Sequence, residues 1–246
     1  MSNLESWVVF EGVKISKEEY EFLKEITKVC GITLEDLYKK KRIEVKDGHV
    51  VYLEISGKGV NYLLENIDKL RISEGLGISF NRLTSLPESI FKLKNLKKLD
   101  VSHNELTSLP RYIYSLSKLE ELDVSYNELT SLPRYIGKLK NLKKLDVSCN
   151  ELTSLPESIC DLYELEELDV SYNELTSLPR YIYSLSKLEK LNVSHNELTS
   201  LPKDIYLYSY NLRNLRKLDV SCNPLTDREK RSLENIFREF RTLIIF

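Results

Sequence analysis

A unit of 23 residues repeats along most of this chain, and the repeat limits what the chain can fold into. One copy reads LKKLDVSHNELTSLPRYIYSLSK from Leu96. The frame extends backwards through Ser73 and, more weakly, through Val50, and it continues at Leu119, Leu142, Leu165, Leu188 and Leu215. A single copy cannot bury its own apolar side chains, so consecutive copies must stack and share one core. The sequence therefore predicts an extended array of units with a long concave surface.

The pattern inside each unit indicates its local structure. Leu99 and Val101 flank Asp100, which is the period-two alternation of a strand. A Leu-Pro pair then ends strand pairing, because proline has no N–H to donate, and Ile113 and Leu116 fit a short helical or 3₁₀ turn on the convex side. A buried asparagine needs partners for both its amide and its carbonyl, so a stack of asparagines bonded to neighbouring backbone is expected. These recur at position 9 as Asn81, Asn104, Asn127, Asn150, Asn173, Asn196 and Asn223.

Residues 1–49 are predicted to cap the first unit, because an open array would expose its core and a strand edge. The segment Ser16-Lys17-Glu18-Glu19 has the pattern of a capping box and opens a helix expected to run through Val29. Thr33 is expected to cap a second short helix over 34–40. The cap is therefore predicted to be partly helical.

Two hairpins are also expected in this cap. Asp47-Gly48 lies between apolar alternations, a strong hairpin signal. One arm of that hairpin is predicted to pair antiparallel with the first repeat strand, near 51–55, and so to close the edge. A smaller hairpin over 7–15 is expected to turn at Glu11-Gly12.

The repeats are expected to span 50–225, and residues 226–246 are predicted to form the second cap. Thr226–Glu229 has another capping-box pattern, followed by apolar residues at the spacing of an amphipathic helix. The apolar tail 243–246 is expected to add a last strand, and the alternative is that it docks on a partner or a second copy. The unit from Leu188 has four extra residues, which should bulge on the convex side or rim.

Composition and cysteine placement restrict the partners and the compartment. A net charge of -2 and a pI of about 6.1 give no basic footprint for nucleic acid. Neither a signal-peptide pattern nor an apolar run long enough to span a membrane is present. Cys149 and Cys222 occupy equivalent positions three units apart, so their Cα atoms should lie about 14 Å apart, whereas a disulfide needs less than about 7 Å. Reduced thiols and a cytoplasmic location are therefore expected.

The repeat consensus L-x-x-L-D-V-S-x-N-E-L-T-S-L-P-x-x-I-x-x-L-x-x resembles intracellular leucine-rich repeats of the kind found in Ras-pathway scaffolds and in similar bacterial and viral proteins. The resemblance covers roughly residues 50–240. It implies an α/β horseshoe-shaped solenoid with a concave parallel sheet, a helical and hairpin N-terminal cap and a helical C-terminal cap. It also implies a scaffold that binds another protein, of unknown identity, on the concave sheet.

Positions 3, 5, 7 and 8 of each unit are expected on that concave face. Position 3 alternates lysine and glutamate, which predicts cross-strand ion pairs that either neutralise one another or form a docking strip. Position 5 is a column of aspartates, whose repulsion the lysines or a bound cation would have to offset, so a basic partner is favoured. The candidate protein-binding residues are Lys98, Asp100, His103, Glu121, Asp123, Tyr126, Lys144, Asp146, Glu167, Asp169, Tyr172, Lys190 and His195.

Position 8 is the most variable of these columns. Tyr126 and Tyr172 should lie about 10 Å apart, which suits a pair of aromatic anchors. His103 and His195 should lie about 19 Å apart and so cannot share a metal. With no catalytic motif in the sequence, neither an enzyme nor a cofactor is expected. Two alternatives to the scaffold are a self-assembling structural protein that uses the C-terminal tail, and an adaptor or effector that uses the N-terminal cap as a second contact.

Overall fold

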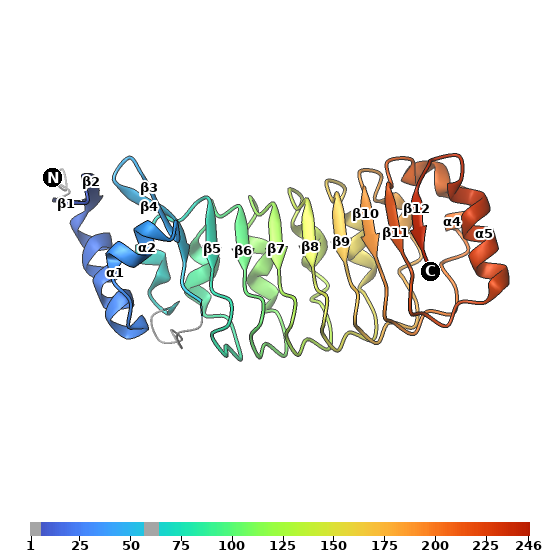
Figure 1. Ribbon diagram of the computed structural model, residues 1–246, viewed down its shortest axis with the longest axis horizontal. Coiled ribbons are helices and arrows are strands. Elements are labelled where there is room, and N and C mark those ends of the chain that lie inside the picture. Colours follow the sequence, from blue (N-terminus) through green and yellow to red (C-terminus); the bar gives the residue numbers. More distant parts are fainter. Residues whose placement is uncertain (1–5, 57–63) are drawn as a thin grey trace.

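A long, curved sheet organises the molecule in the computed structural model, which describes residues 6–56 and 64–246 (Figure 1). Residues 1–5 of the expected cap and 57–63 of the expected repeats lie outside the described residues. Ten strands of the described chain form this sheet in sequence order, and all pairs from β4 onwards are parallel. They are β3 (Ile43–Lys46), β4 (His49–Glu54), β5 (Gly75–Gly77), β6 (Lys98–Asp100), β7 (Glu121–Asp123), β8 (Lys144–Asp146), β9 (Glu167–Asp169), β10 (Lys190–Asn192), β11 (Lys217–Asp219) and β12 (Leu243–Ile245).

The pairing register follows the repeat period. Leu99 pairs with Leu122 and Leu122 with Leu145, so equivalent residues of successive units lie side by side. The middle residue of each short strand points into the core, and the two flanking residues point out of it. This register confirms the prediction of one parallel sheet built by identical units.

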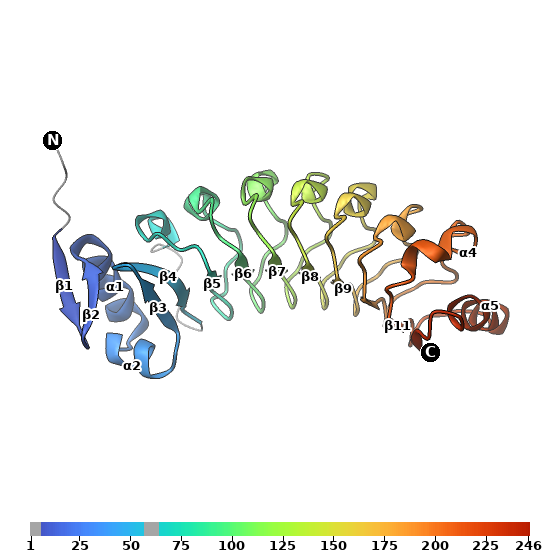
Figure 2. The same cartoon turned by 90° about the horizontal axis from the view of Figure 1, so that it is seen from above.

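Short helices cover the outer side of the curve, as Figure 2 shows. From η2 (Glu88–Lys92) onwards, each follows the Leu-Pro pair of its unit, where the proline ends strand pairing. In the long unit, α4 (Ile205–Tyr208) and η7 (Ser209–Leu212) hold the extra residues on this side, which confirms the predicted convex bulge. The other units carry the 3₁₀ helices η1 (Ile67–Lys69), η2 (Glu88–Lys92), η3 (Arg111–Ser115), η4 (Ile136–Lys138), η5 (Glu157–Asp161) and η6 (Ile182–Ser184).

A ladder of asparagines joins the units on the inside. Asn127 Nδ2 lies within 3.1 Å of the carbonyl oxygens of Val101, Val124 and Ser125, and its Oδ1 accepts from the N–H of Leu106 at 3.0 Å. The same pattern recurs from unit to unit. Each side chain therefore satisfies backbone groups of its own unit and of the unit before it, which confirms the predicted stack.

The N-terminal cap contains both predicted hairpins and both predicted helices. Strands β1 (Trp7–Phe10) and β2 (Val13–Ser16) turn at Glu11-Gly12, and β3 turns into β4 at Asp47-Gly48. All four turn residues have positive φ, between 48° and 82°, as two-residue hairpin turns of this kind require. Strand β3 pairs antiparallel with β4 and closes the sheet edge. The helices are α1 (Lys17–Cys30) and α2 (Leu34–Lys39).

The predicted capping box at the start of α1 is only half formed. Ser16 Oγ accepts a hydrogen bond from the N–H of Glu19 at 3.3 Å, as expected. The Glu19 carboxylate does not return to Ser16. It is buried and accepts from the N–H groups of Val50 and Arg71, both at 3.0 Å. The reason is that the Ser16 N–H already donates to Gly48, while these two backbone donors need an acceptor.

The C-terminal cap repeats this departure. Thr226 Oγ1 accepts from the N–H of Glu229 at 3.2 Å at the start of α5 (Asp227–Phe237). The Glu229 carboxylate then leaves the helix to accept from the Leu201 N–H at 3.1 Å and from the Tyr206 hydroxyl. The second capping box is therefore also half formed. The tail forms β12, parallel to β11, which confirms the predicted last strand.

Candidate functional site

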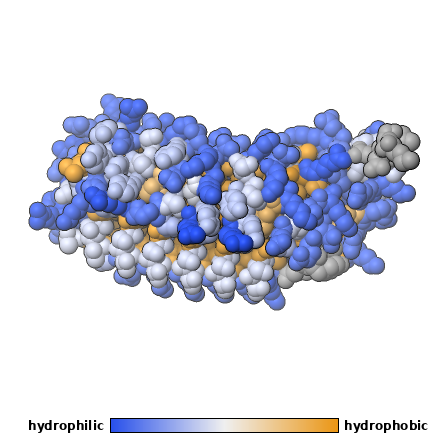
Figure 3. Space-filling view, turned by 180° about the vertical axis from the view of Figure 1, so that it is seen from behind, coloured by the Kyte–Doolittle hydropathy of each residue, from blue (hydrophilic) through white to orange (hydrophobic). Residues whose placement is uncertain are grey.

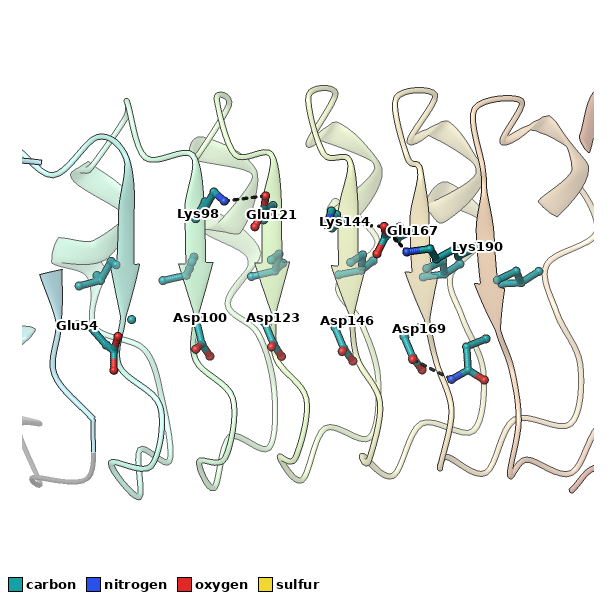
Figure 4. Close-up of a pocket in the computed structure, with 18 of the residues that line it drawn as sticks. Glu54, Lys98, Asp100, Glu121, Asp123, Lys144, Asp146, Glu167, Asp169 and Lys190 are labelled. Atoms are coloured by element: carbon teal, nitrogen blue, oxygen red, sulfur yellow. Dashed lines mark hydrogen bonds and ion pairs between the residues drawn. The ribbon is translucent and has the colours of Figure 1, made fainter. Parts of the chain in front are cut away.

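A groove of about 490 Å³ runs along the concave face of the sheet. The residues at positions 3 and 5 of strands β6 to β10 line it, with Tyr52 and Glu54 of β4 at one end and Lys217 at the other. These positions point out of the sheet because the residue between them points into the core. Figure 4 shows the two positions as two rows of side chains across neighbouring strands.

The residues at position 3 form the upper row in Figure 4, and this row holds the predicted ion pairs. Lys98 pairs with Glu121 at 2.9 Å. Glu167 lies between two lysines, 3.5 Å from Lys144 and 2.9 Å from Lys190 (Figure 4). The hydrogen bond from Lys190 is the largest of the effects that lower the pKa of the Glu167 carboxyl. The cross-strand pairing predicted from the sequence is therefore confirmed along this row, although each exposed pair adds little to stability.

The residues at position 5 form the lower row, which consists of aspartates that lie side by side in Figure 4. Each accepts two hydrogen bonds from the serine two residues further on, and Asp123 Oδ1 lies 2.9 Å from the Ser125 nitrogen and 2.7 Å from its hydroxyl. These serine donors stabilise the row, and the expectation that lysines or a bound cation offset the repulsion between aspartates stays a prediction. Burial raises the pKa of Asp146, and Asp123 and Asp169 raise it further. Asp100 completes the row.

The column at position 8 does not line this groove, and its expected place on the concave face beside the charged rows stays a prediction. Its residues all have φ between 50° and 57°, so the chain turns at this position and the alternation of the strand ends before it. The column consists of Phe80, His103, Tyr126, Cys149, Tyr172, His195 and Cys222. The role of its members in binding stays a prediction.

The rings of this column stack on one another. The His103 ring lies between those of Phe80 and Tyr126, with centroids 4.1 Å apart on both sides. Tyr172 and His195 form a second stack at 4.0 Å. The planes within each pair lie within 11° of parallel. Sequence reasoning treated the histidines and tyrosines separately, although their shared repeat position was the signal that could have joined them.

The thiols and the acidic groups suggest no reactive centre. Among the described residues, no group of three or more histidine, cysteine, aspartate or glutamate side chains could hold a metal ion. No disulfide joins the four cysteines, all of which lie in the described part of the chain, and burial is the main reason that the pKa of Cys160 rises to about 12. A thiol with this pKa is not ionised at neutral pH and is a poor nucleophile.

The convex face differs from the groove. Three of its tyrosines each carry the guanidinium of the preceding arginine over the ring, at 4.7 Å for Arg111 on Tyr112 and 4.9 Å for Arg134 on Tyr135. The third pair is Arg180 on Tyr181 at 5.5 Å. Figure 3 shows this side covered mainly by hydrophilic side chains, with hydrophobic ones between them. In the described chain, no helix is long and apolar enough to cross a membrane.

Comparisons with known families give the same architecture. The family described as leucine-rich repeat region matches residues 122–244, and the family described as leucine-rich repeat matches residues 74–129. A comparison with curated proteins found no match.

Solved structures of bacterial proteins are similar as well. A leucine-rich repeat protein of Leptospira interrogans has a TM-score of 0.66 and 27% identity, over 87% of this chain and 57% of its own. This chain thus spans little more than half of that protein. Internalin C2 of Listeria monocytogenes has a TM-score of 0.65 and 20% identity, over 91% of this chain and 92% of its own. Internalin inlF of the same species has a TM-score of 0.61 and 20% identity, over 78% and 52%. At these identities the internalins share the fold alone.

Proposed function

Because the chain belongs to the leucine-rich repeat proteins, we propose that it is a protein-interaction scaffold that binds a partner protein in the concave groove. The observation that carries the proposal is the pair of charged rows on the groove wall, one of alternating sign and one acidic. An extended segment with basic side chains would place its cations against the aspartate row and leave the ion-paired row beside it.

The acidic row supports a basic partner for a second reason. The serine donors occupy one oxygen of each aspartate, and for Asp123 and Asp146 no further hydrogen-bond partner occurs in the described chain. The second oxygen of these carboxylates is thus available to a ligand. Burial already raises the pKa of Asp146, so a partner's cation close to it would lower that pKa and bind more tightly to the ionised form.

The test compares two variants with equal changes in charge. The double variant Lys144→Glu/Lys190→Glu alters the groove, where both side chains are about half exposed. The control Lys140→Glu/Lys187→Glu alters exposed side chains that do not line the groove. Wild type and both variants are immobilised, and proteins captured from the native lysate are identified. Because these substitutions make the groove more acidic, a basic partner should be recovered in greater amount on the groove variant than on wild type and the control, and equal recovery on all three would refute the concave-face site.

We also propose an intracellular, cytoplasmic signalling role, which the resemblance of the consensus to Ras-pathway scaffolds supports. Cysteines that form no disulfide in the described chain are consistent with a reducing compartment. Fractionation of native cells with detection by antibody tests this location. Recovery in a secreted or periplasmic fraction would contradict it.

A second candidate is self-association through the C-terminal strand. Strand β12 pairs with β11 on one side, while Leu243 is 60% exposed and Phe246 is 38% exposed. An apolar edge strand of this kind can pair with another chain. Size-exclusion chromatography with light scattering should show oligomers that increase with concentration and disappear in Leu243→Lys/Phe246→Lys. A monomer at all concentrations would exclude this candidate.

A further inference from the structure

The column of stacked rings at position 8 has one ring, or rung, per unit, and one rung is missing in its middle. Rings occupy the position in the units on both sides, but at Cys149 a thiol stands where a ring would be. Tyr126 and Tyr172 are stacked on His103 and His195 on their outer faces. Their inner faces are therefore directed towards the gap above Cys149.

The gap has the width of one inserted planar group. Neighbouring strands of a sheet lie about 4.8 Å apart, so two strand spacings separate the Tyr126 and Tyr172 rings by about 10 Å. A flat group placed midway would lie about 5 Å from each ring, close to the 4.7 and 4.9 Å at which Arg111 and Arg134 lie over their tyrosine rings. Tyr126 and Tyr172 are 52% and 53% exposed and Cys149 is partly exposed, so the gap opens to solvent.

The units that form the gap carry exposed carboxylates. Glu128, Glu151 and Glu174 each follow a residue of the column by two positions and are exposed. In the part of the chain that the structure describes, none of the three forms an ion pair. On the groove side, Asp146 contributes to the raised pKa of Tyr126, after the larger effect of a hydrogen bond with the Cys149 thiol. The gap therefore combines two aromatic faces with negative charge.

We propose that the gap between Tyr126 and Tyr172 binds the guanidinium group of an arginine side chain presented by a partner protein. A guanidinium is planar and cationic, so it can stack on both rings and donate hydrogen bonds in its plane to a carboxylate such as Glu151. A lysine ammonium lacks the plane that would contact both rings. A neutral aromatic ring would fill the gap but leave the carboxylates of these units without a partner.

The protein already uses this chemistry on its convex face. Arg111 and Arg134 place their guanidinium groups over Tyr112 and Tyr135, with 4.7 and 4.9 Å to the ring centroids. Both also donate a hydrogen bond to the tyrosine hydroxyl. Those sites offer one ring each, whereas the gap offers two. The proposed site is separate from the concave groove and does not depend on the occupant of the groove.

The experiment measures the preference for arginine over lysine. Acetylated hexa-arginine and hexa-lysine peptides are titrated into the full chain by calorimetry at one ionic strength, so that general attraction to acidic residues affects both peptides. Wild type is expected to bind hexa-arginine about five-fold more tightly, the range of a cation held against aromatic rings. Equal affinities for the two peptides would overturn the proposal.

Two cysteines provide a matched pair of variants. Cys149→Phe should complete the column, close the gap and remove the preference for arginine. Cys222→Phe makes the same change at the same repeat position, where a ring stands on one side only, at His195, and should leave the preference intact. A preference that survives in Cys149→Phe would overturn the site. If that variant does not fold by circular dichroism, Tyr172→Leu tests the same contact and should also lose the preference.

Two further arms separate this site from others. The groove variant Lys144→Glu/Lys190→Glu should keep the arginine preference, so a change in partner capture there and a loss of preference here report on different surfaces. N-acetyl-phenylalaninamide should compete poorly with hexa-arginine. Strong competition by this neutral ring would show that the gap selects aromatic side chains and would contradict the choice of guanidinium.

Discussion

The two ends of the solenoid each carry a glutamate at the third position of a cap helix, and both glutamates leave the helix to bind the neighbouring repeats. Glu19 is 2% exposed and accepts from two backbone N–H groups, those of Val50 and Arg71. Glu229 is only partly buried and accepts from one backbone N–H and from the hydroxyl of Tyr206. The same residue thus closes the two ends with different kinds of partner.

This difference shows where each cap gets its stability. At the N-terminal end, the Glu19 carboxylate joins helix α1 to the backbone of strand β4 and of the segment before β5. At the C-terminal end, one of the two bonds depends on a side chain of the long, irregular unit, and desolvation and the carboxylate both raise the pKa of the Tyr206 hydroxyl. We therefore expect the N-terminal end to be more sensitive to loss of its glutamate.

The largest effect is expected for Glu19→Ala. The substitution leaves one buried and one partly buried N–H group without an acceptor, which should lower the free energy of unfolding by about 4 kcal/mol. Urea denaturation followed by circular dichroism measures the change. The control is Glu18→Ala, which removes an exposed carboxylate of the same helical turn and should cost less than about 0.5 kcal/mol. Similar losses for Glu19→Ala and Glu18→Ala would show that the buried carboxylate does not stabilise the N-terminal cap.

A smaller loss is expected for Glu229→Ala, about 3 kcal/mol, because one backbone donor and one hydroxyl lose their acceptor. In a double-mutant cycle, Tyr206→Phe should be destabilising in wild type and nearly neutral in Glu229→Ala. Glu234→Ala, an exposed carboxylate on the same helix, serves as the control. Additive effects of the two substitutions would show that the Tyr206 bond does not stabilise the cap.

Removing residues 243–246 should cost about 2 kcal/mol, because Ile244 and Ile245 are each about half buried against the last unit. Thermal unfolding of the truncated chain measures the loss. If the truncated chain unfolds at the same temperature as wild type, β12 does not stabilise the last unit. Deletion that changes only the oligomeric state would instead favour self-association.

The smallest effects should be equal at the two ends. Ser16→Ala and Thr226→Ala each remove one N-cap bond, of 3.3 and 3.2 Å, and each should cost about 1 kcal/mol. Urea midpoints of the two variants are compared directly. A clear inequality between them would place the difference between the caps in the helix starts rather than in the glutamates.

The sequence predicted those parts of the fold that local chemistry determines. The 23-residue period determines the strand register, and the asparagine at position 9 has partners only if units stack. Asp47-Gly48 has few conformations open to it other than a tight turn. The prediction of complete capping boxes was wrong. The residue pattern predicts the hydrogen bond to the serine or threonine side chain, but the direction of the glutamate depends on backbone donors far away in the chain.

The candidate site was predicted in part, for similar reasons. The ion pairs of the upper row follow directly from the register, as in Lys98 and Glu121. The serine donors to the aspartates were missed although they stand two residues away in every unit. That the column at position 8 lies outside the groove could not be predicted, because a positive φ cannot be recognised from a residue such as Tyr126 or Cys149, which is neither glycine nor asparagine.

The asparagine ladder also determines how such a chain can change its length during evolution. Each rung bonds to its own unit and the one before it, so the duplication or loss of a whole unit leaves every bond in place. A partial unit would leave amides and carbonyls unsatisfied. Recombination within the gene therefore adds or removes whole rungs, and an extra copy inserted beside Cys149 would widen the gap in the ring column by one rung. Selection could in this way alter what the column accepts without remaking the core.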